Sequence, residues 1–177
     1  MDKSANEYKL KVEGIIPLIV DINENGTLSF YNEHKMLIAE NVVEYNVREN
    51  NGLMIFITKD KKYYVFDRYS HIIVEGEVFD KWKNSIRLFL NSDNLLNSFL
   101  NLNEEDFKCT PFIDDSIKVL QHSVQDNLER NKNLTNKQAL KEENDIYNLV
   151  INKLNNCAPD LVAPVTTYLN HGRELNV

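Results

Sequence analysis

The spacing of the apolar residues changes near Asp80, from a period of two to a period of three and four. Between about Tyr8 and Phe79 these residues form short alternating runs, which are separated by Asn, Gly, Asp and Lys. Alternation is typical of β-strands, and spacing of three and four is typical of one face of a helix. The chain is therefore predicted to have an α+β fold, with an N-terminal antiparallel meander of six to seven strands followed by about four helices.

Within the predicted meander, two Asn-Gly pairs mark hairpins. Asn25-Gly26 and Asn51-Gly52 each lie between apolar runs, and Asn-Gly tolerates positive φ at both central positions of a two-residue turn. Residues 53–57 are apolar on both faces, which predicts a strand that is covered on both sides. In the last strand, 72–79, three apolar side chains are expected to face inward: Ile72, Val74 and Val78.

The helical part begins at Asp80, a residue type that caps helices. An apolar stripe at helical spacing comes directly after it: Trp82, Ile86, Phe89 and Leu90. Such a stripe is the buried face of an amphipathic helix. Because Trp82 starts the stripe where this helix meets the meander, its side chain is expected to be buried.

Three further helices are expected to start near Ser92, Pro111 and Thr135, the last with a capping box. Pro159 and Pro164 interrupt the C-terminal segment after about Asn156, so at most a short helix is expected before Gly172. These patterns divide the chain into two parts. We expect residues 1–91 to form a β-rich half closed by one helix, and residues 92–177 to form a helical half that packs on the first as one compact unit.

The chain is acidic, with 20 basic and 27 acidic residues and a net charge of −7. Binding of nucleic acid without sequence preference needs clustered Lys and Arg, which displace counterions from phosphates. No nucleic-acid partner is therefore expected. An acidic surface suits a basic protein partner instead.

A membrane partner is not expected either. The longest apolar run, 53–57, is far shorter than a membrane-spanning helix. Residues 1–11 are polar and charged and lack the apolar centre of a signal peptide. We therefore expect a soluble, cytoplasmic protein.

The sequence contains no His-Glu-x-x-His, no Cys-x-x-Cys and no Gly-x-Ser-x-Gly motif. The five glycines, at positions 14, 26, 52, 76 and 172, are too far apart to build a phosphate-binding loop. Cys109 and Cys157 have no metal-ligand spacing and are expected to be reduced thiols. We expect no catalytic residue, no cofactor and no metal site.

An alternative interpretation is an enzyme whose site is assembled from distant residues, such as His71, Glu75 and His122. His71, Glu75 and Glu77 project from one face of a predicted strand, where two carboxylates can share a cation or a proton. The simpler interpretation is that they are the water-facing positions of an alternating strand. His122 and Asp126 lie four residues apart but off the apolar stripe of their helix, which indicates a solvated pair.

Two short stretches, residues 26–31 (Gly-Thr-Leu-Ser-Phe-Tyr) and 80–86 (Asp-Lys-Trp-Lys-Asn-Ser-Ile), resemble pleckstrin-homology-type domains. The first resembles their third strand, and the second their closing helix, where a Trp plugs one end of the barrel. The resemblance covers residues 8–91 and implies a peptide or lipid adaptor as a further alternative. Phosphoinositide-binding members place several Lys and Arg around the first hairpin. This chain has Asp21, Glu24 and Asn25 there, so lipid binding is not implied.

The segment from Asn103 to Asp115 is the candidate partner-facing element. It carries five carboxylates against one lysine, Lys108, and two phenylalanines lie among them. Aromatic anchors surrounded by charge are typical of an interface core with a polar rim. The candidate partner-binding residues are Glu104, Glu105, Asp106, Phe107, Phe112, Asp114 and Asp115. In the alternative, the phenylalanines belong to the core, and Asp114 and Asp115 stabilise the start of a helix.

The function that these patterns favour is non-catalytic recognition of a basic protein, as by an inhibitor, an immunity protein or an accessory protein. Charged faces are sufficient to steer such an association.

Overall fold

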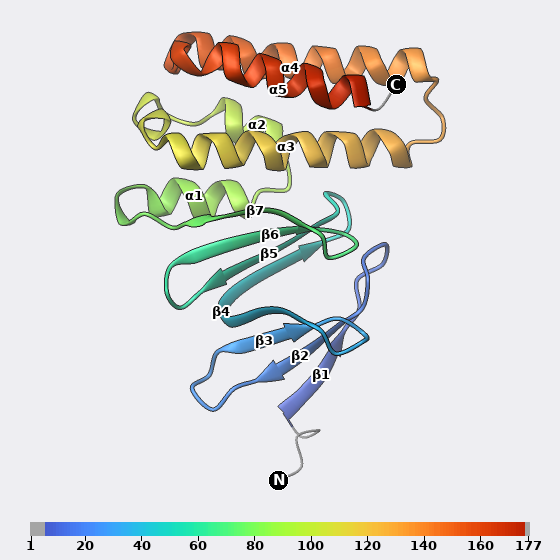
Figure 1. Cartoon of the computed structure of the whole chain (residues 1–177), viewed down its shortest axis with the longest axis vertical. Coiled ribbons are helices and arrows are strands. Elements are labelled where there is room, and N and C mark those ends of the chain that lie inside the picture. The colour runs from blue at the N-terminus through green and yellow to red at the C-terminus, as the bar shows by residue number, and fades with distance from the viewer. Residues whose placement is uncertain (1–5, 176–177) are drawn as a thin grey trace. The chain divides into compact units, whose positions relative to one another are not determined.

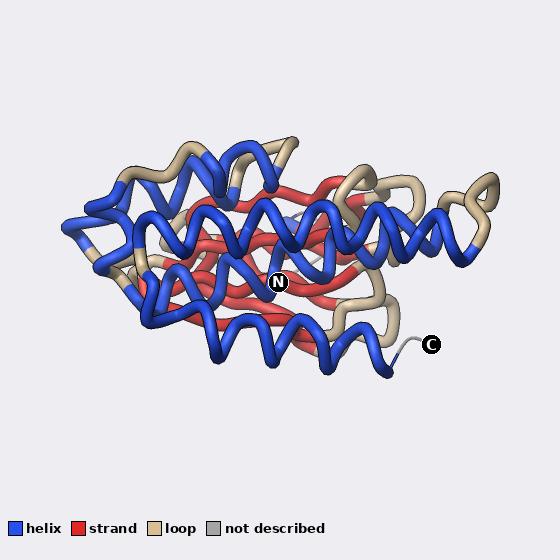
Figure 2. The backbone as a smooth tube through the Cα atoms, turned by 90° about the horizontal axis from the view of Figure 1, so that it is seen from above, coloured by secondary structure: helices blue, strands red, loops and turns tan. Residues whose placement is uncertain are grey.

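The structure is a computed structural model that describes residues 6–175, with side chains described as far as residue 170. Within this range strands occupy the first part of the chain and helices the second (Figures 1 and 2). The strands are β1 (Glu7–Leu10), β2 (Leu18–Ile22), β3 (Leu28–Tyr31), β4 (Leu37–Arg48), β5 (Leu53–Thr58), β6 (Lys62–Asp67) and β7 (Ile72–Glu77). They form one antiparallel sheet in chain order, which confirms the predicted α+β class and the meander.

The α-helices of the described range are α1 (Lys83–Leu90), α2 (Leu95–Leu100), α3 (Thr110–Arg130), α4 (Asn136–Cys157) and α5 (Val162–Leu175). Short 3-10 turns precede α1, α3 and α5, and these are η2 (Asp80–Trp82), η3 (Glu104–Lys108) and η4 (Pro159–Leu161). None of these helices is both long enough and apolar enough to cross a membrane, as far as the described residues extend.

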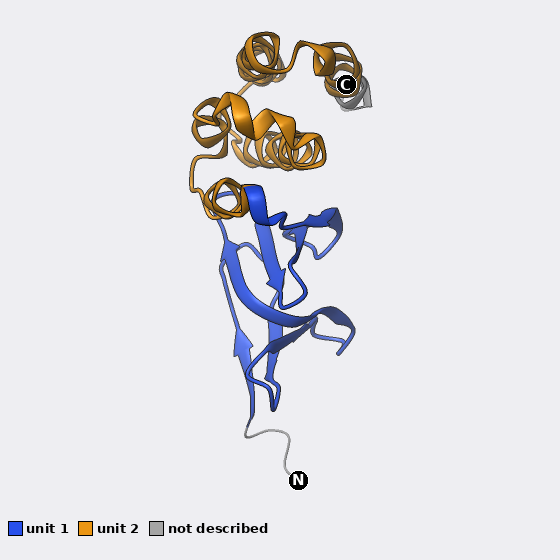
Figure 3. Cartoon of the chain, turned by 90° about the vertical axis from the view of Figure 1, so that its left-hand side faces the viewer, with its two compact units in different colours: residues 1–81 blue, residues 82–177 orange. Residues whose placement is uncertain are grey.

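The chain divides into two compact units, a β unit of residues 1–81 and a helical unit of residues 82–177 (Figure 3). Helix α1 groups with the helical unit, whereas the sequence pattern assigned it to the β-rich part. The reason is a set of contacts within the helical unit, since Phe89 of α1 packs edge-to-face on Phe112 with ring centroids 5.9 Å apart.

Strand β4 bends and belongs to two halves of the sheet. Its first part pairs with β3 as far as Val42, and its second part pairs with β5 from Val42 onward. At the bend the register shifts between Val42 and Glu44, and Asn41 has a positive φ of 56°. A bulge of this kind increases the local twist and redirects a strand.

The core of the β unit lies between these two halves. It is formed by side chains from both of them: Ile15, Leu18, Val20, Phe30, Ala39, Val42, Met54, Phe56 and Phe66. Phe30 of β3 packs on Phe56 of β5 with ring centroids 4.6 Å apart. The two halves of the sheet therefore fold face to face.

The burial of strand β5 was predicted correctly from the sequence, and that of the edge strand β7 only in part. All six residues of β5 are buried, which confirms that 53–57 is covered on both sides. Val74 of β7 and Val78 just after it are buried as predicted, but Ile72 is 53% exposed, so its predicted inward orientation was wrong. The reason is that Ile72 begins an edge strand, where only β6 lies alongside it.

The hairpins join the predicted strands, but their turns differ from the expected type. Gly26 has a φ of +85° and Gly52 of +63°, whereas neither Asn25 nor Asn51 has a positive φ. Gly26 N–H donates to Asn23 O at 3.0 Å, the bond of a type I turn with a left-handed residue after it. The same geometry recurs in three further hairpins, β3–β4, β5–β6 and β6–β7, where the left-handed residues are Lys35, Lys61 and Ser70.

Lys35 is therefore a position where glycine should stabilise the protein. An L-residue in the left-handed region costs about 1–2 kcal/mol, and glycine loses about 0.5–1 kcal/mol of that gain through its unfolded-state entropy. Lys35→Gly is expected to raise the free energy of unfolding by about 0.5–1 kcal/mol in urea titrations. The matched variant is Lys59→Gly, in the β5–β6 hairpin, where φ is not positive. It should destabilise the chain, and a loss of stability in Lys35→Gly as well would contradict the argument.

Trp82 is half-buried rather than buried, which corrects the expectation for this residue. It ends the 3-10 turn η2 and precedes α1, so it does not start the apolar stripe of the helix. Its indole Nε1–H donates to Glu105 O at 3.1 Å. Asp80 does not cap the α-helix either, because it lies in η2 and forms an ion pair with Lys61 at 2.9 Å.

The later helices agree more closely with the sequence signals. The predicted capping box at the start of α4 is confirmed, since Thr135 Oγ1 accepts from Gln138 N–H at 3.1 Å. The terminal helix is longer than expected, because α5 continues past Gly172. Pro159 opens η4 and Pro164 lies in the first turn of α5, where a missing N–H costs no helical hydrogen bond.

Buried Arg68 joins three loops of the β unit. Its guanidinium donates from Nη1 to Gly14 O and from Nη2 to Glu49 O, the latter at 3.4 Å. In return, Arg68 O accepts from Ile16 N–H at 3.1 Å. The β1–β2 loop, the β4–β5 turn and the β6–β7 turn therefore meet at one side chain.

Candidate functional site

The two phenylalanines of the predicted acidic segment are core residues. Phe107 is 4% exposed and Phe112 is 1% exposed. Phe107 packs edge-to-face on Phe99 of α2 at 5.7 Å between ring centroids. Neither ring is accessible as an anchor for a partner. Both belong to the core, as the alternative interpretation predicted.

Asp106 is also a structural residue. Its side chain is buried, Oδ1 accepts from Ser85 Oγ at 2.6 Å, and Oδ2 accepts from Asn103 N–H at 2.9 Å. The second bond is part of a capping box at the start of η3. Asp106 thus connects α1 with η3 inside the helical unit and is unsuited to contact a partner.

The remaining carboxylates of the segment lie at the surface, and two of them are neutralised locally. Glu105 pairs with Lys108 at 2.9 Å, and Asp114 pairs with Lys118 at 3.1 Å. These hydrogen bonds raise the pKa of both lysines. Glu104 is exposed and Asp115 is half-buried. The segment therefore presents less net negative charge than its composition indicates.

The residues of the alternative enzymatic site come from both units, His71 and Glu75 from the β unit and His122 from the helical unit. His71 lies on the surface of the β unit, with Nδ1 3.4 Å from Asp67 Oδ2. The other oxygen of Asp67 accepts from the backbone N–H groups of Tyr69 and His71, so this pair closes the β6–β7 turn. Glu75 and Glu77 are exposed, and exposed His122 belongs to α3 of the helical unit. Among residues with described side chains, no group of three His, Cys, Asp or Glu could hold a metal ion.

The β unit contains a polar hollow that the sequence did not reveal. It has a volume of about 440 Å³ and lies at the β2–β3 hairpin. Its lining residues are Asn6, Asp21, Ile22, Asn23, Glu24, Asn25 and Asn41. In the sequence, the only local sign of this hollow is the alternation of polar residues from Asp21 to Asn25. Asn6 and Asn41 come from other segments, and only the fold brings them here.

A hydrogen-bond network holds the hairpin beside this hollow. Asn23 Nδ2 donates to Thr27 Oγ1 at 3.0 Å and to Ser29 Oγ at 3.1 Å. Asn25 Oδ1 accepts from Thr27 N–H at 3.1 Å and from Thr27 Oγ1 at 2.6 Å. Both hydroxyl residues are buried. The wall of the hollow is therefore formed before any ligand arrives.

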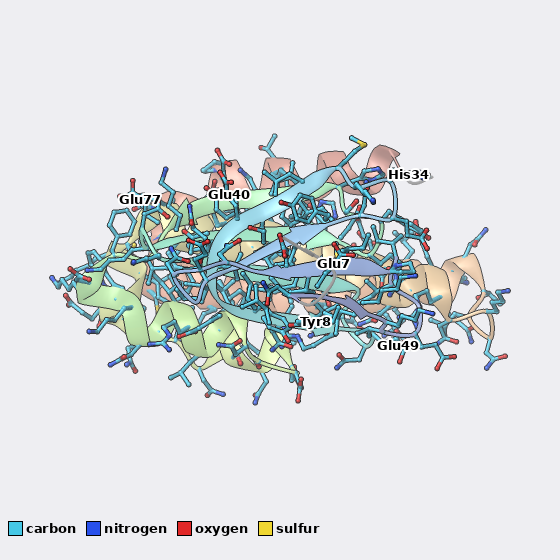
Figure 4. The ribbon with its side chains drawn as sticks, turned by 90° about the horizontal axis from the view of Figure 1, so that it is seen from below. Glu7, Tyr8, His34, Glu40, Glu49 and Glu77 are labelled. Atoms are coloured by element: carbon cyan, nitrogen blue, oxygen red, sulfur yellow. The ribbon has the colours of Figure 1, made fainter. Side chains whose placement is uncertain are left out.

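The surface of the β unit carries carboxylates of another kind. Figure 4 labels Glu7, Glu40, Glu49 and Glu77, which come from β1, β4, the β4–β5 turn and β7. All four are exposed. In the described structure, Glu7, Glu40 and Glu77 form no ion pair with a basic side chain, in contrast to Glu105 and Asp114.

Comparisons with protein-family models, with curated proteins and with solved structures find no match to this chain. The resemblance to pleckstrin-homology-type domains accordingly stays a prediction from two short stretches. No function can be carried over from a relative, so a proposed function depends on the charges and contacts of the chain itself.

Proposed function

We propose that the chain is a non-catalytic protein-interaction domain that binds a basic protein, as an inhibitor, an immunity protein or an accessory protein does. One observation carries the proposal. The exposed carboxylates Glu7, Glu40 and Glu77 of the β unit have no basic neighbour within ion-pair distance in the described structure. Lys62 lies opposite Glu77 in the register of β6 and β7, but among the described residues none of the three carboxylates is held in an ion pair, so all three are open to an incoming partner.

The contact with the protein partner is accordingly expected on the β unit and not in segment 103–115. In that segment the anchors are buried, and Glu105 and Asp114 already have lysine partners. Uncompensated surface charge accelerates encounter with an oppositely charged protein, whereas a locally neutralised pair contributes little to it. The β unit thus supplies the steering, and the segment supplies packing within the helical unit.

The test uses two variants with equal net charge. Glu7→Gln/Glu40→Gln/Glu77→Gln and Glu104→Gln/Glu105→Gln/Asp114→Asn each remove three negative charges, which changes the net charge from −7 to −4. Asp106 is left intact because it is buried and hydrogen-bonded. Wild type and both variants are immobilised, and the protein retained from the native cell extract is identified and its association rate measured.

We expect the retained protein to be basic. At low ionic strength it should associate with the Glu7/Glu40/Glu77 variant about tenfold more slowly than with the wild type. The difference should shrink in high salt, because exposed charges are then screened. The variant of segment 103–115 should behave as the wild type. Equal rates for both variants, or retention of an acidic protein, would overturn the proposal.

A further inference from the structure

The polar hollow at the β2–β3 hairpin is rich in acceptors and has an apolar wall. Asp21 and Glu24 supply carboxylates, and side-chain amides come from Asn6, Asn23, Asn25 and Asn41. Ile22, which is 45% exposed, adds apolar surface. Among the described residues that line the hollow there is no lysine or arginine. A cationic ligand with an apolar portion is therefore the chemical class that its lining matches.

A bare calcium ion is a poorer match, although the order Asp21-x-Asn23-x-Asn25-Gly26 has the spacing of a calcium-binding loop. The seventh position of such a loop offers a backbone carbonyl, but Thr27 O already accepts from Asn23 N–H at 2.9 Å. The oxygen of Asn25 accepts two hydrogen bonds from Thr27. The twelfth position, which supplies a bidentate Glu, is Asn32.

We propose that this hollow receives an arginine side chain of the protein partner. A guanidinium presents five N–H donors in one plane, which the carboxylate oxygens of Asp21 and Glu24 can accept together. The aliphatic stem of arginine buries itself along apolar surface, and Ile22 provides that surface. A volume of about 440 Å³ accommodates a whole side chain, whereas a single ion would leave most of it to water. This inference rests on the proposed function, because it names the anchor that a basic partner inserts.

The probe is N-acetyl-arginine amide, added to the ¹⁵N-labelled full chain. Its matched control is N-acetyl-citrulline amide, which has nearly the same shape and no charge. The side-chain amide signals of Asn6, Asn23, Asn25 and Asn41 report binding directly, since these groups line the hollow. We expect a dissociation constant on the order of millimolar for the arginine compound, as befits one side chain without its protein. The citrulline compound should produce no saturable shift.

Two double variants decide whether the carboxylates are responsible. Asp21→Asn/Glu24→Gln keeps the shape of the wall. It is expected to raise the dissociation constant of the arginine compound about tenfold. Glu33→Gln/Glu75→Gln removes the same charge from exposed positions that do not line the hollow, and should bind as the wild type. Unchanged thermal unfolding of both variants shows that they are folded.

Three outcomes would overturn the inference. One is the absence of shifts at these four amides, and another is equal binding of the citrulline compound. The third is saturation by calcium chloride at about 1 mM with displacement of the arginine compound, which would identify a calcium loop instead. Failure here is distinguishable from failure of the proposed function. A basic partner that still depends on Glu7, Glu40 and Glu77 would leave the protein-binding proposal standing.

Discussion

Replacing Phe56 by alanine is expected to lower the free energy of unfolding by about 3–5 kcal/mol, a large share of a typical total of about 5–15 kcal/mol. The side chain is fully buried at the centre of the β-unit core. Its ring packs on Phe30 at 4.6 Å and edge-to-face on Phe66 at 5.7 Å between centroids. Truncation removes both aromatic contacts and leaves a cavity between the two halves of the sheet. Urea denaturation followed by circular dichroism measures the change.

The matched control is Ile72→Ala, in the same sheet. Ile72 is 53% exposed, so its truncation should cost less than about 1 kcal/mol. A similar loss of stability in both variants would mean that the core does not lie where the burial of these side chains places it. The comparison also tests whether the side chain of Ile72 faces solvent.

The strands and helices could be predicted from the sequence because their signals are local. The continuous apolar run 53–57 and the capping box at Thr135 each depend on neighbours within a few residues. The turn types could not be predicted in this way. Asn25-Gly26 is compatible with two hairpin geometries, and the cross-strand bond from Asn23 N–H to Thr27 O selects the longer loop.

Burial at the boundaries of elements also depends on distant residues. Alternation groups Val43 with Tyr45 on one apolar face of β4, yet both side chains are exposed, at 52% and 41%. The register shift between Val42 and Glu44 interrupts the alternation. Trp82 has the spacing of a helical core residue, yet its position is set by a hydrogen bond to Glu105, far along the chain. The periodicity of apolar residues therefore does not show at which residue a helix or strand ends.

The candidate site was harder to predict than the fold, for the same reason. The composition of 103–115 suits an interface, but Phe107 meets Phe99, and Asp106 meets Ser85. These contacts decide that both residues are internal. The polar hollow shows the converse case, since Asn6 and Asn41 carry no functional signal until the fold brings them beside Asp21.

Removal of the Arg68 side chain is expected to be the most destabilising single change among the charged residues. Arg68→Ala should cost about 2–4 kcal/mol, because it deletes two hydrogen bonds from a buried charged group and leaves their acceptors without this donor. The acceptors, Gly14 O and Glu49 O, belong to two different loops. Glycine at position 14 is required for this approach. A Cβ there would lie 3.0 Å from Arg68 Nη1, and its φ of +78° is in the left-handed region.

Two further variants separate the geometry of the guanidinium from its charge. Arg68→Lys keeps the charge, but a single ammonium cannot reproduce the planar fork that reaches both carbonyls, so about half of the loss should remain. Arg130→Ala removes an arginine with a surface ion pair to Asp126 at 3.6 Å and should cost less than about 1 kcal/mol. Urea denaturation measures the loss of unfolding free energy for Arg68→Ala, Arg68→Lys and Arg130→Ala, from the shift of the midpoint at an unchanged m-value. If Arg68→Ala proves as mild as Arg130→Ala, the three loops are held together by their own turns, and the buried arginine is not what joins them.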